Sequence, residues 1–113
     1  MQRYGRTVLL KDDPEVIRRY EDYHAHVWPE VEASLRSAGI TRMLIFRFAR
    51  TLLMYMETVD GFRFEHTPTP AERDPRAVEW ENLMRSFQEP VPGAPSDGTW
   101  VTMPEIFTFP AGS

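Results

Sequence analysis

The sequence predicts an α+β fold of the ferredoxin-like kind, with the element order β-α-β-β-α-β in a single domain over residues 1–113. Three observations predict this fold. Four runs are rich in β-branched and aromatic residues, as strands are, and an Asp-Pro pair opens each of the two helical segments between them. The connection at 49–51 is so short that the two middle strands must form an antiparallel hairpin.

The first strand leads directly into a helix. Residues 3–10 read as a strand, and Asp13 is expected to cap a helix whose first residue is Pro14. In that helix, apolar and ring-bearing residues recur at spacings of three and four. They form one stripe of Val16, Ile17, Tyr20, Tyr23, His24 and Val27.

This helix is expected to be interrupted before the sheet resumes. Pro29 disfavours helical geometry at Trp28, which predicts a break or kink near 25–28. A second helical stretch then runs to about Ala38 and stops at Gly39, because glycine commonly ends helices.

The two middle strands, 43–48 and 52–59, carry apolar residues at both parities. Because side chains alternate between the faces of a sheet, this pattern predicts that both faces are covered. Helices can cover only one of them in the predicted order. We therefore expect a second copy of the chain to cover the other face in a homodimer.

The last third of the chain repeats the helix-then-strand order. Residues 74 and 75 form the second cap-and-proline start, and the helix that follows carries a stripe of Trp80, Leu83, Met84 and Phe87. Residues 90–98 are a loop by composition. A final strand is expected over 100–109, where Pro104 indicates an edge position or a bulge.

Composition narrows the possible functions. The formal net charge is -4 and no basic run exceeds two adjacent residues, so we expect no nucleic-acid partner. No apolar stretch approaches the ~20 residues of a membrane span, and no secretory signal opens the chain, so we expect no membrane partner. There is no cysteine, and the expected location is cytoplasmic.

The first helix carries the most distinctive group of side chains. Tyr20 and His24 are four residues apart and therefore neighbours, with Trp28 one turn further on if the helix continues. Flat rings beside a phenol and an imidazole suit a small polyhydroxylated ligand. The alternative is that these rings only pack on the sheet, and that His24 is a hydrogen-bonded structural residue rather than an acid or base.

Metal and nucleotide cofactors are not expected. His24 and His26 lie two residues apart, so on a helix they point in different directions, and His66 is the only other histidine. The sequence has no glycine-rich phosphate loop and no dinucleotide-binding fingerprint. Trp80 is either a platform for stacking or a core residue, and its spacing does not decide between the two.

Several features recur together along nearly the whole chain: Tyr-x3-His-x3-Trp-Pro-Glu at 20–30, a glycine at 39, Trp80 and the closing PEIFTF run at 104–109. In these features the chain resembles the L-rhamnose mutarotase family. The resemblance implies a dimeric α+β barrel protein that interconverts the anomers of 6-deoxy sugars without a cofactor. It also implies that His24 is the acid/base residue and that Tyr20 binds the substrate.

The departures from that family concern the sugar. Rhamnose enzymes carry a further sugar-contacting tyrosine at the position of Met43, and a Trp-Trp pair where this chain has Glu79 and Trp80. The runs FRFEH (62–66) and VEWENLM (78–84) look like the branch of the family assigned to L-fucose. We therefore expect L-fucose, with L-rhamnose as the alternative, and expect Glu79 to contact a sugar hydroxyl.

Two other classes of protein fit the same scaffold. One is a non-catalytic dimer that binds a sugar or another small molecule, and the other is a cofactor-free monooxygenase. The fold cannot separate them from a mutarotase, because function depends on the site.

Overall fold

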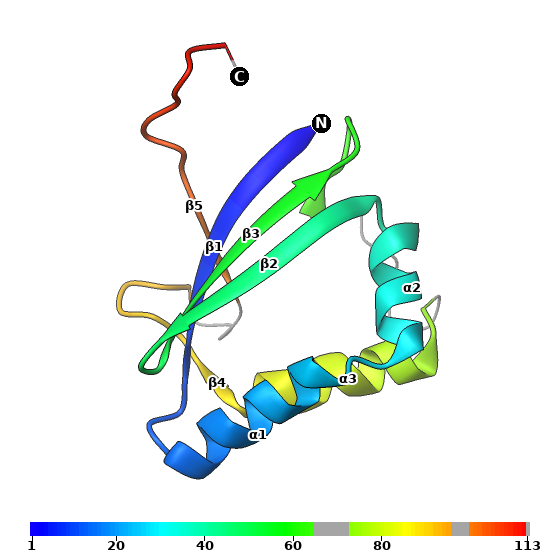
Figure 1. Cartoon of the computed structure of the whole chain (residues 1–113), viewed down its shortest axis with the longest axis vertical. Coiled ribbons are helices and arrows are strands. Elements are labelled where there is room, and N and C mark those ends of the chain that lie inside the picture. Colours follow the sequence, from blue (N-terminus) through cyan, green and yellow to red (C-terminus); the bar gives the residue numbers. More distant parts are fainter. Residues whose placement is uncertain (65–72, 96–99, 113) are drawn as a thin grey trace.

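The computed structural model describes residues 1–64, 73–95 and 100–112. It confirms the predicted order of elements and adds one short strand (Figure 1). The elements are β1 (Gln2–Leu10), α1 (Pro14–Ala25), α2 (Pro29–Ser37), β2 (Ile40–Phe48), β3 (Thr51–Thr58), α3 (Pro75–Ser86), β4 (Gln88–Glu89) and β5 (Val101–Met103).

The strands form one antiparallel sheet in the order β2-β3-β1, and β1 also pairs with both β4 and β5. The fourth strand of the ferredoxin-like sheet is therefore supplied in two pieces. The expectation of one long strand over 100–109 was wrong, because β5 ends at Met103. The next residue is Pro104, which has no N–H to continue the ladder.

The local signals for the helices are confirmed. The side chain of Asp13 accepts a hydrogen bond from the Glu15 amide at 2.9 Å, and that of Asp74 accepts one from the Arg76 amide at 2.8 Å. The first helix ends at Ala25 and α2 begins at Pro29, as the proline predicts. Gly39, with φ at +93°, turns the chain from α2 into β2.

All three helices lie on one face of the twisted sheet (Figure 1). Alternate residues of β1 and β3 form the floor beneath them, with Val8, Leu10, Leu52 and Met56 buried. The core has two clusters, one around Tyr20 and Trp80 and the other around Met54, Met56 and Phe62, and both are packed by Ile45 and Trp100. These two shared residues join the helical part of the core to the end of the sheet.

The opposite face of the sheet, which we call the open face, carries no helix. It presents Leu44, Phe46, Phe48 and Leu53, of which Phe46 is 56% exposed and Phe48 85% exposed. The apolar residues on the two sides of the middle strands thus lie on different faces of the sheet. One face is covered by the helices, and the other is uncovered in the single chain. Among the described helices, none is both long and apolar enough to cross a membrane.

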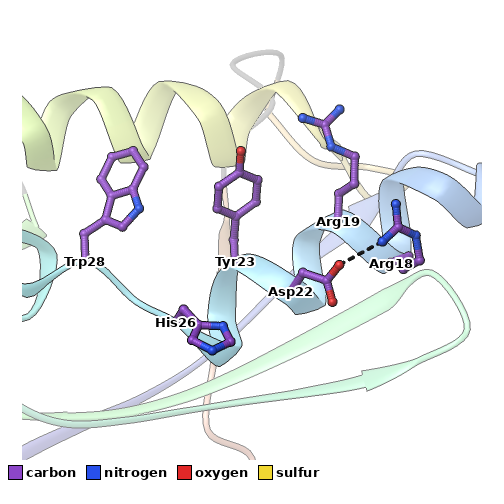
Figure 2. Close-up of a pocket in the computed structure, with 6 residues that line it drawn as sticks. All are labelled: Arg18, Arg19, Asp22, Tyr23, His26 and Trp28. Carbon is purple, nitrogen blue, oxygen red and sulfur yellow. Dashed lines mark hydrogen bonds and ion pairs between the residues drawn. The ribbon is translucent and has the colours of Figure 1, made fainter.

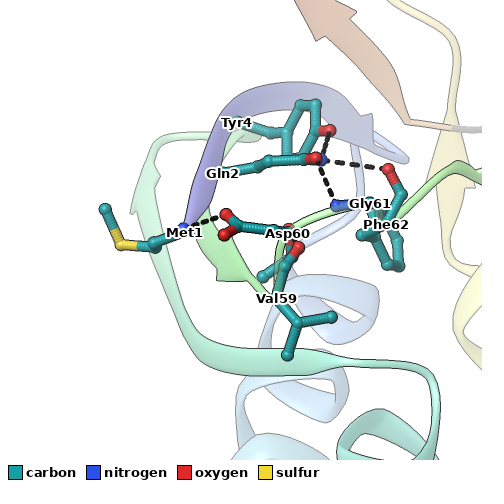
Figure 3. A network of polar contacts seen from close by, with 8 residues as sticks. Met1, Gln2, Tyr4, Val59, Asp60, Gly61 and Phe62 are labelled. Carbon is teal, nitrogen blue, oxygen red and sulfur yellow. Dashed lines mark hydrogen bonds and ion pairs between the residues drawn. The ribbon is translucent and has the colours of Figure 1, made fainter.

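The start of β1 is tied to the turn that follows β3 (Figure 3). The Gln2 side chain donates to the Tyr4 hydroxyl at 2.6 Å and to the Phe62 carbonyl at 3.0 Å, and it accepts from the Gly61 amide at 2.9 Å. The amino terminus pairs with Asp60. These bonds hold Phe62 against the ring of Tyr4, with 6.1 Å between centroids, at the edge of the second core cluster.

Candidate active site

The predicted neighbours on α1 do lie together. The rings of Tyr20 and His24 are stacked, with 4.4 Å between their centroids and 29° between their planes. The capped start of α1 fixes the helix, and the four-residue spacing then places both side chains on one face. Tyr23, one position before His24, points towards α3 (Figure 2).

Trp80 on α3 is the centre of an aromatic cluster. Its ring meets Tyr23, His24 and Trp28 edge-on, at centroid distances of 5.9, 5.4 and 5.1 Å. Such tilted contacts are the preferred geometry of aromatic pairs. Trp80 is only 6% exposed, so in the single chain a ligand would reach little of the indole.

His24 is held in one tautomer by its own helix. Its Nδ1 lies 2.8 Å from the carbonyl oxygen of Tyr20, which can only accept, so Nδ1 carries the proton. Burial lowers the pKa of His24 below 6.5, and the backbone hydrogen bond opposes this shift only partly. At neutral pH the imidazole is therefore uncharged, with a lone pair on Nε2 that can accept a proton.

Tyr20 lies deeper than His24, at 4% exposure. Burial raises the pKa of its phenol to about 12, although a hydrogen bond from Gln88 at 3.4 Å acts in the opposite direction. The phenol therefore keeps its proton at neutral pH. Because its oxygen accepts from Gln88, the hydroxyl hydrogen is available to donate to a neighbouring oxygen.

Trp28 and Glu79 are linked by Arg76, which no sequence pattern marks as a site residue. The guanidinium of Arg76 lies 3.8 Å from the centroid of the Trp28 ring and donates to the Glu79 carboxylate at 3.0 Å. The side chain of Glu79 is 60% exposed and is not part of the aromatic cluster. The sequence around Arg76 gives no signal of this contact, because Trp28 lies in the distant connection between α1 and α2.

Met43 lies apart from the α1 residues. It is half-buried on the helix-covered face of β2 and packs with the second core cluster, beside Met54 and Met56. Trp100 and Ile45, which belong to both clusters, lie between Met43 and the Tyr20–Trp80 group. The structure thus joins Tyr20, His24, Trp28 and Trp80 directly, and Met43 only through these intermediaries.

His26 is exposed, and its side chain points away from α3, towards which Tyr23 points (Figure 2). It lines a surface cavity of about 390 Å³ with Arg18, Arg19, Asp22, Tyr23 and Trp28. His24 is not among the lining residues, so this cavity lies beside the candidate base rather than over it. Within the described residues no three acids or histidines are grouped as metal ligands, and His66 lies outside those residues.

Asp22 and Glu21, the acids that precede His24 on α1, are both engaged in ion pairs. Asp22 is paired with Arg18 at 2.9 Å, and Glu21 with Arg47 at 3.2 Å. Both carboxylates are more than half exposed, at 66% and 53%. On α1 the side chains thus offer one neutral imidazole and one protonated phenol beside several aromatic rings.

Comparisons with known proteins identify the family of the chain. A family model described as L-rhamnose mutarotase matches residues 3–109. The chain is 38% identical over 111 residues to an L-fucose mutarotase of Xanthomonas campestris pv. campestris, covering 96% of this chain and 89% of that protein.

Two solved structures share the fold. One is an L-rhamnose mutarotase from Formosa agariphila, with a TM-score of 0.68, 17% identity and coverage of 96% of this chain and 98% of the other. The second is the tetracenomycin F2 cyclase of Streptomyces glaucescens, with a TM-score of 0.62, 16% identity and coverage of 97% and 100%. The fold and the resemblance inferred from the sequence are thereby confirmed.

Proposed function

The chain belongs to the L-rhamnose mutarotase family, and we propose that its substrate within that family is L-fucose. Members of the family are isomerases that interconvert the anomers of monosaccharides. The observation that carries the proposal is the 38% identity, over 96% of the chain, to a protein named L-fucose mutarotase. L-rhamnose is the second candidate, because the family model and one structural neighbour carry that name.

The chemistry at two positions supports L-fucose over L-rhamnose. A methionine at position 43 cannot donate the hydrogen bond that a tyrosine gives to a sugar hydroxyl. Glu79 offers an acceptor where the rhamnose enzymes have an indole, and Arg76 holds that carboxylate at 3.0 Å. L-fucose differs from L-rhamnose in hydroxyl configuration, so changed polar groups at these positions suit a changed sugar.

His24 acts in this proposal as the proton carrier. Mutarotation removes the proton of the anomeric hydroxyl, breaks the bond between C1 and the ring oxygen, lets the aldehyde rotate and closes the ring on the other face. A neutral imidazole with its Nε2 lone pair free can accept that first proton. Mutarotation also occurs in water, so general base catalysis of ~10²–10⁴-fold with positioning is sufficient.

The remaining site residues bind the sugar. The Tyr20 hydroxyl donates to a sugar oxygen, while Trp28 and its neighbour Trp80 supply apolar ring surface. Position 43 and Glu79 set the preference among sugars. Neither the binding-only nor the monooxygenase alternative is favoured by membership of a mutarotase family, although the cyclase neighbour illustrates that this fold carries other chemistry.

The test is anomeric exchange measured by NMR saturation transfer on L-fucose, L-rhamnose, D-galactose and D-ribose at equal enzyme concentration. We expect the fastest exchange with L-fucose and loss of that exchange in His24→Gln. Arg36→Gln, on the exposed side of α2, is the matched control and should exchange at the wild-type rate. Equal rates on all four sugars would contradict L-fucose as the substrate, and full activity of His24→Gln would contradict the role of His24.

A homodimer formed through the open face is part of the proposal. The exposed Leu44, Phe46, Phe48 and Leu53 form a continuous apolar surface across β2 and β3, and such surfaces mark interfaces. A second copy presents the same surface, as a twofold interface requires. We expect light scattering after gel filtration to give twice the chain mass, and Leu53→Asp to give the monomer. A monomeric wild-type protein would contradict the dimer without affecting the assignment of the sugar.

A further inference from the structure

Arg6 is a cation on the helix-covered face of β1 without a described counter-charge. Its Nε donates to the Thr102 hydroxyl at 3.1 Å and its Nη2 to the Trp100 carbonyl at 3.1 Å. Its guanidinium carbon lies 4.4 Å from the centroid of the Phe64 ring. All three partners are neutral, and desolvation alone lowers the pKa of Arg6.

This arrangement is costly for a structural residue. A half-buried charge loses hydration, and without an opposite charge the loss is compensated only in part. A methionine or leucine at this position would extend the apolar floor formed by Val8 and Leu10 without that cost. A guanidinium also has five N–H groups, and the bonds to Thr102 and Trp100 use only part of them.

The register of the sheet places Arg6 between the two parts of the candidate site. Arg6 pairs across the sheet with Thr102 on β5 and with Met54 on β3, and Met54 pairs with Ile45 on β2. Two residues towards the start of β1, on the same face of the sheet, Tyr4 pairs with Met56 on β3, and Met56 pairs with Met43 on β2.

Two residues further along β1, on the same face, Val8 pairs with Leu52 on β3, and both pack in the cluster of Tyr20 and Trp80. Trp100, whose carbonyl Arg6 binds, packs against both clusters. Arg6 therefore lies in the floor between the residue expected to read the sugar and the ring cluster that holds His24. Like Met43 and His24, it is not fully buried.

We propose that Arg6 is a catalytic residue of the mutarotase, which contacts the bound sugar and donates hydrogen bonds to its ring oxygen as the ring opens. This inference rests on the proposed function, because it assumes that a sugar ring is opened over His24. Arg6 would supply the positive charge that stabilises the ring oxygen as it becomes negative, a role that the acids on α1 cannot fill.

The steps balance with these two residues alone. Nε2 of His24 takes the proton of the anomeric hydroxyl, the O–H electrons form the C1=O bond, and the electron pair of the bond between C1 and the ring oxygen moves to that oxygen. Arg6 stabilises the resulting negative charge without giving up a proton. The imidazolium then returns the proton to the ring oxygen, and the reverse sequence closes the ring after rotation.

The competing explanation is that Arg6 only fastens β5 to β1 through Thr102 and Trp100. The two explanations differ in what each variant should lose. A fastener contributes stability and leaves the turnover of the folded enzyme unchanged. A group that acts on the transition state lowers kcat, with a smaller effect on KM.

The experiment compares Arg6→Gln and Arg6→Lys with Thr102→Val, which removes one fastening bond and keeps the guanidinium. Exchange of the best sugar is measured over a range of sugar concentrations, and melting temperatures are measured in parallel. We expect Arg6→Gln to lower kcat by about 10²–10³-fold, as for the loss of one oxyanion donor, and Arg6→Lys to retain more activity. Thr102→Val should exchange at the wild-type rate despite a lower melting temperature.

Added guanidinium ion provides a second readout in the Arg6→Ala variant. Partial recovery of exchange at low millimolar guanidinium, absent with added ammonium, would support direct contact with the sugar. Wild-type kcat in folded Arg6→Gln would overturn the proposal while leaving the mutarotase function intact. A wild-type protein inactive on all four sugars would overturn the proposed function, and the role of Arg6 with it.

Discussion

Replacing Gly39 with alanine should destabilise the fold more than the same change at any other described glycine. Gly39 has φ at +93°, which costs an L-residue about 1–2 kcal/mol. A Cβ at this position would lie 2.9 Å from Cγ2 of Val59, and the Gly39 carbonyl already accepts from the Val59 amide at 2.9 Å. That bond keeps the two residues together, so the added methyl group should clash with Val59. The clash should cost about 1 kcal/mol in addition to the backbone strain, the low end for overpacking, because the half-exposed Val59 side chain can shift.

The expected loss of about 2–3 kcal/mol corresponds to a fall in melting temperature of roughly 8–12 °C for a domain of this size. Gly61→Ala is the matched control, because it has φ at +82° and no atom within 4 Å of the added Cβ. It should lose the backbone part alone, about 1–2 kcal/mol. Thermal unfolding at one protein concentration measures both variants, and equal losses would refute the contribution of the Val59 contact. A melting temperature of Gly39→Ala equal to that of the wild type would refute the reasoning altogether.

Three further predictions concern the site and the sheet. The value of kcat/KM for L-fucose should fall at acid pH with a midpoint below 6.5, because burial lowers the pKa of His24 and only the neutral imidazole accepts the proton. The same shift stabilises the folded state above pH 6.5, and this stability is lost as the pH falls through the lowered pKa. The free energy of unfolding of His24→Gln in urea should therefore lack this pH dependence. Tyr20→Phe keeps the ring against His24 but lacks the hydroxyl, so saturation kinetics should give a raised KM, and an unchanged KM would remove Tyr20 from the substrate-binding residues. Arg50→Met should lower the free energy of unfolding in urea by about 1–2 kcal/mol, because it loses the bond to the Leu10 carbonyl at 2.9 Å and the half-exposed pair with Glu89, whereas the surface variant Arg36→Met should differ little from the wild type.

The features that could be predicted from the sequence are those decided by neighbouring residues. The Asp-Pro pairs at both helix starts, the break before Pro29 and the turn at Gly39 each depend on a backbone preference of one or two residues. The contact between Tyr20 and His24 also follows from local geometry, since residues four apart on a helix are neighbours.

The features that could not be predicted depend on pairing between distant segments. Gln88 and Glu89 carry no strand signal in the sequence, and only their pairing with the last residues of β1 makes them a strand. Arg50 ties the β2–β3 hairpin to Leu10 twice: its backbone carbonyl accepts from the Leu10 amide, and its side chain donates to the Leu10 carbonyl. The two residues are 40 positions apart in the sequence, so no local pattern indicates this contact. The contact of His24 with Trp80 likewise requires α1 and α3 to be docked.

The arrangement around His24 suits the proton transfer proposed for this residue. The two oxygens that exchange protons in mutarotation are bonded to the same carbon, so one imidazole nitrogen can serve both in turn. This requires a ring that stays neutral between turnovers and keeps one nitrogen free, and the Tyr20 carbonyl with the surrounding rings meets both requirements. A second titrating side chain would have to gain and lose its proton in coordination with His24. A permanent cation in the floor, as proposed for Arg6, supplies the missing stabilisation without any such coupling.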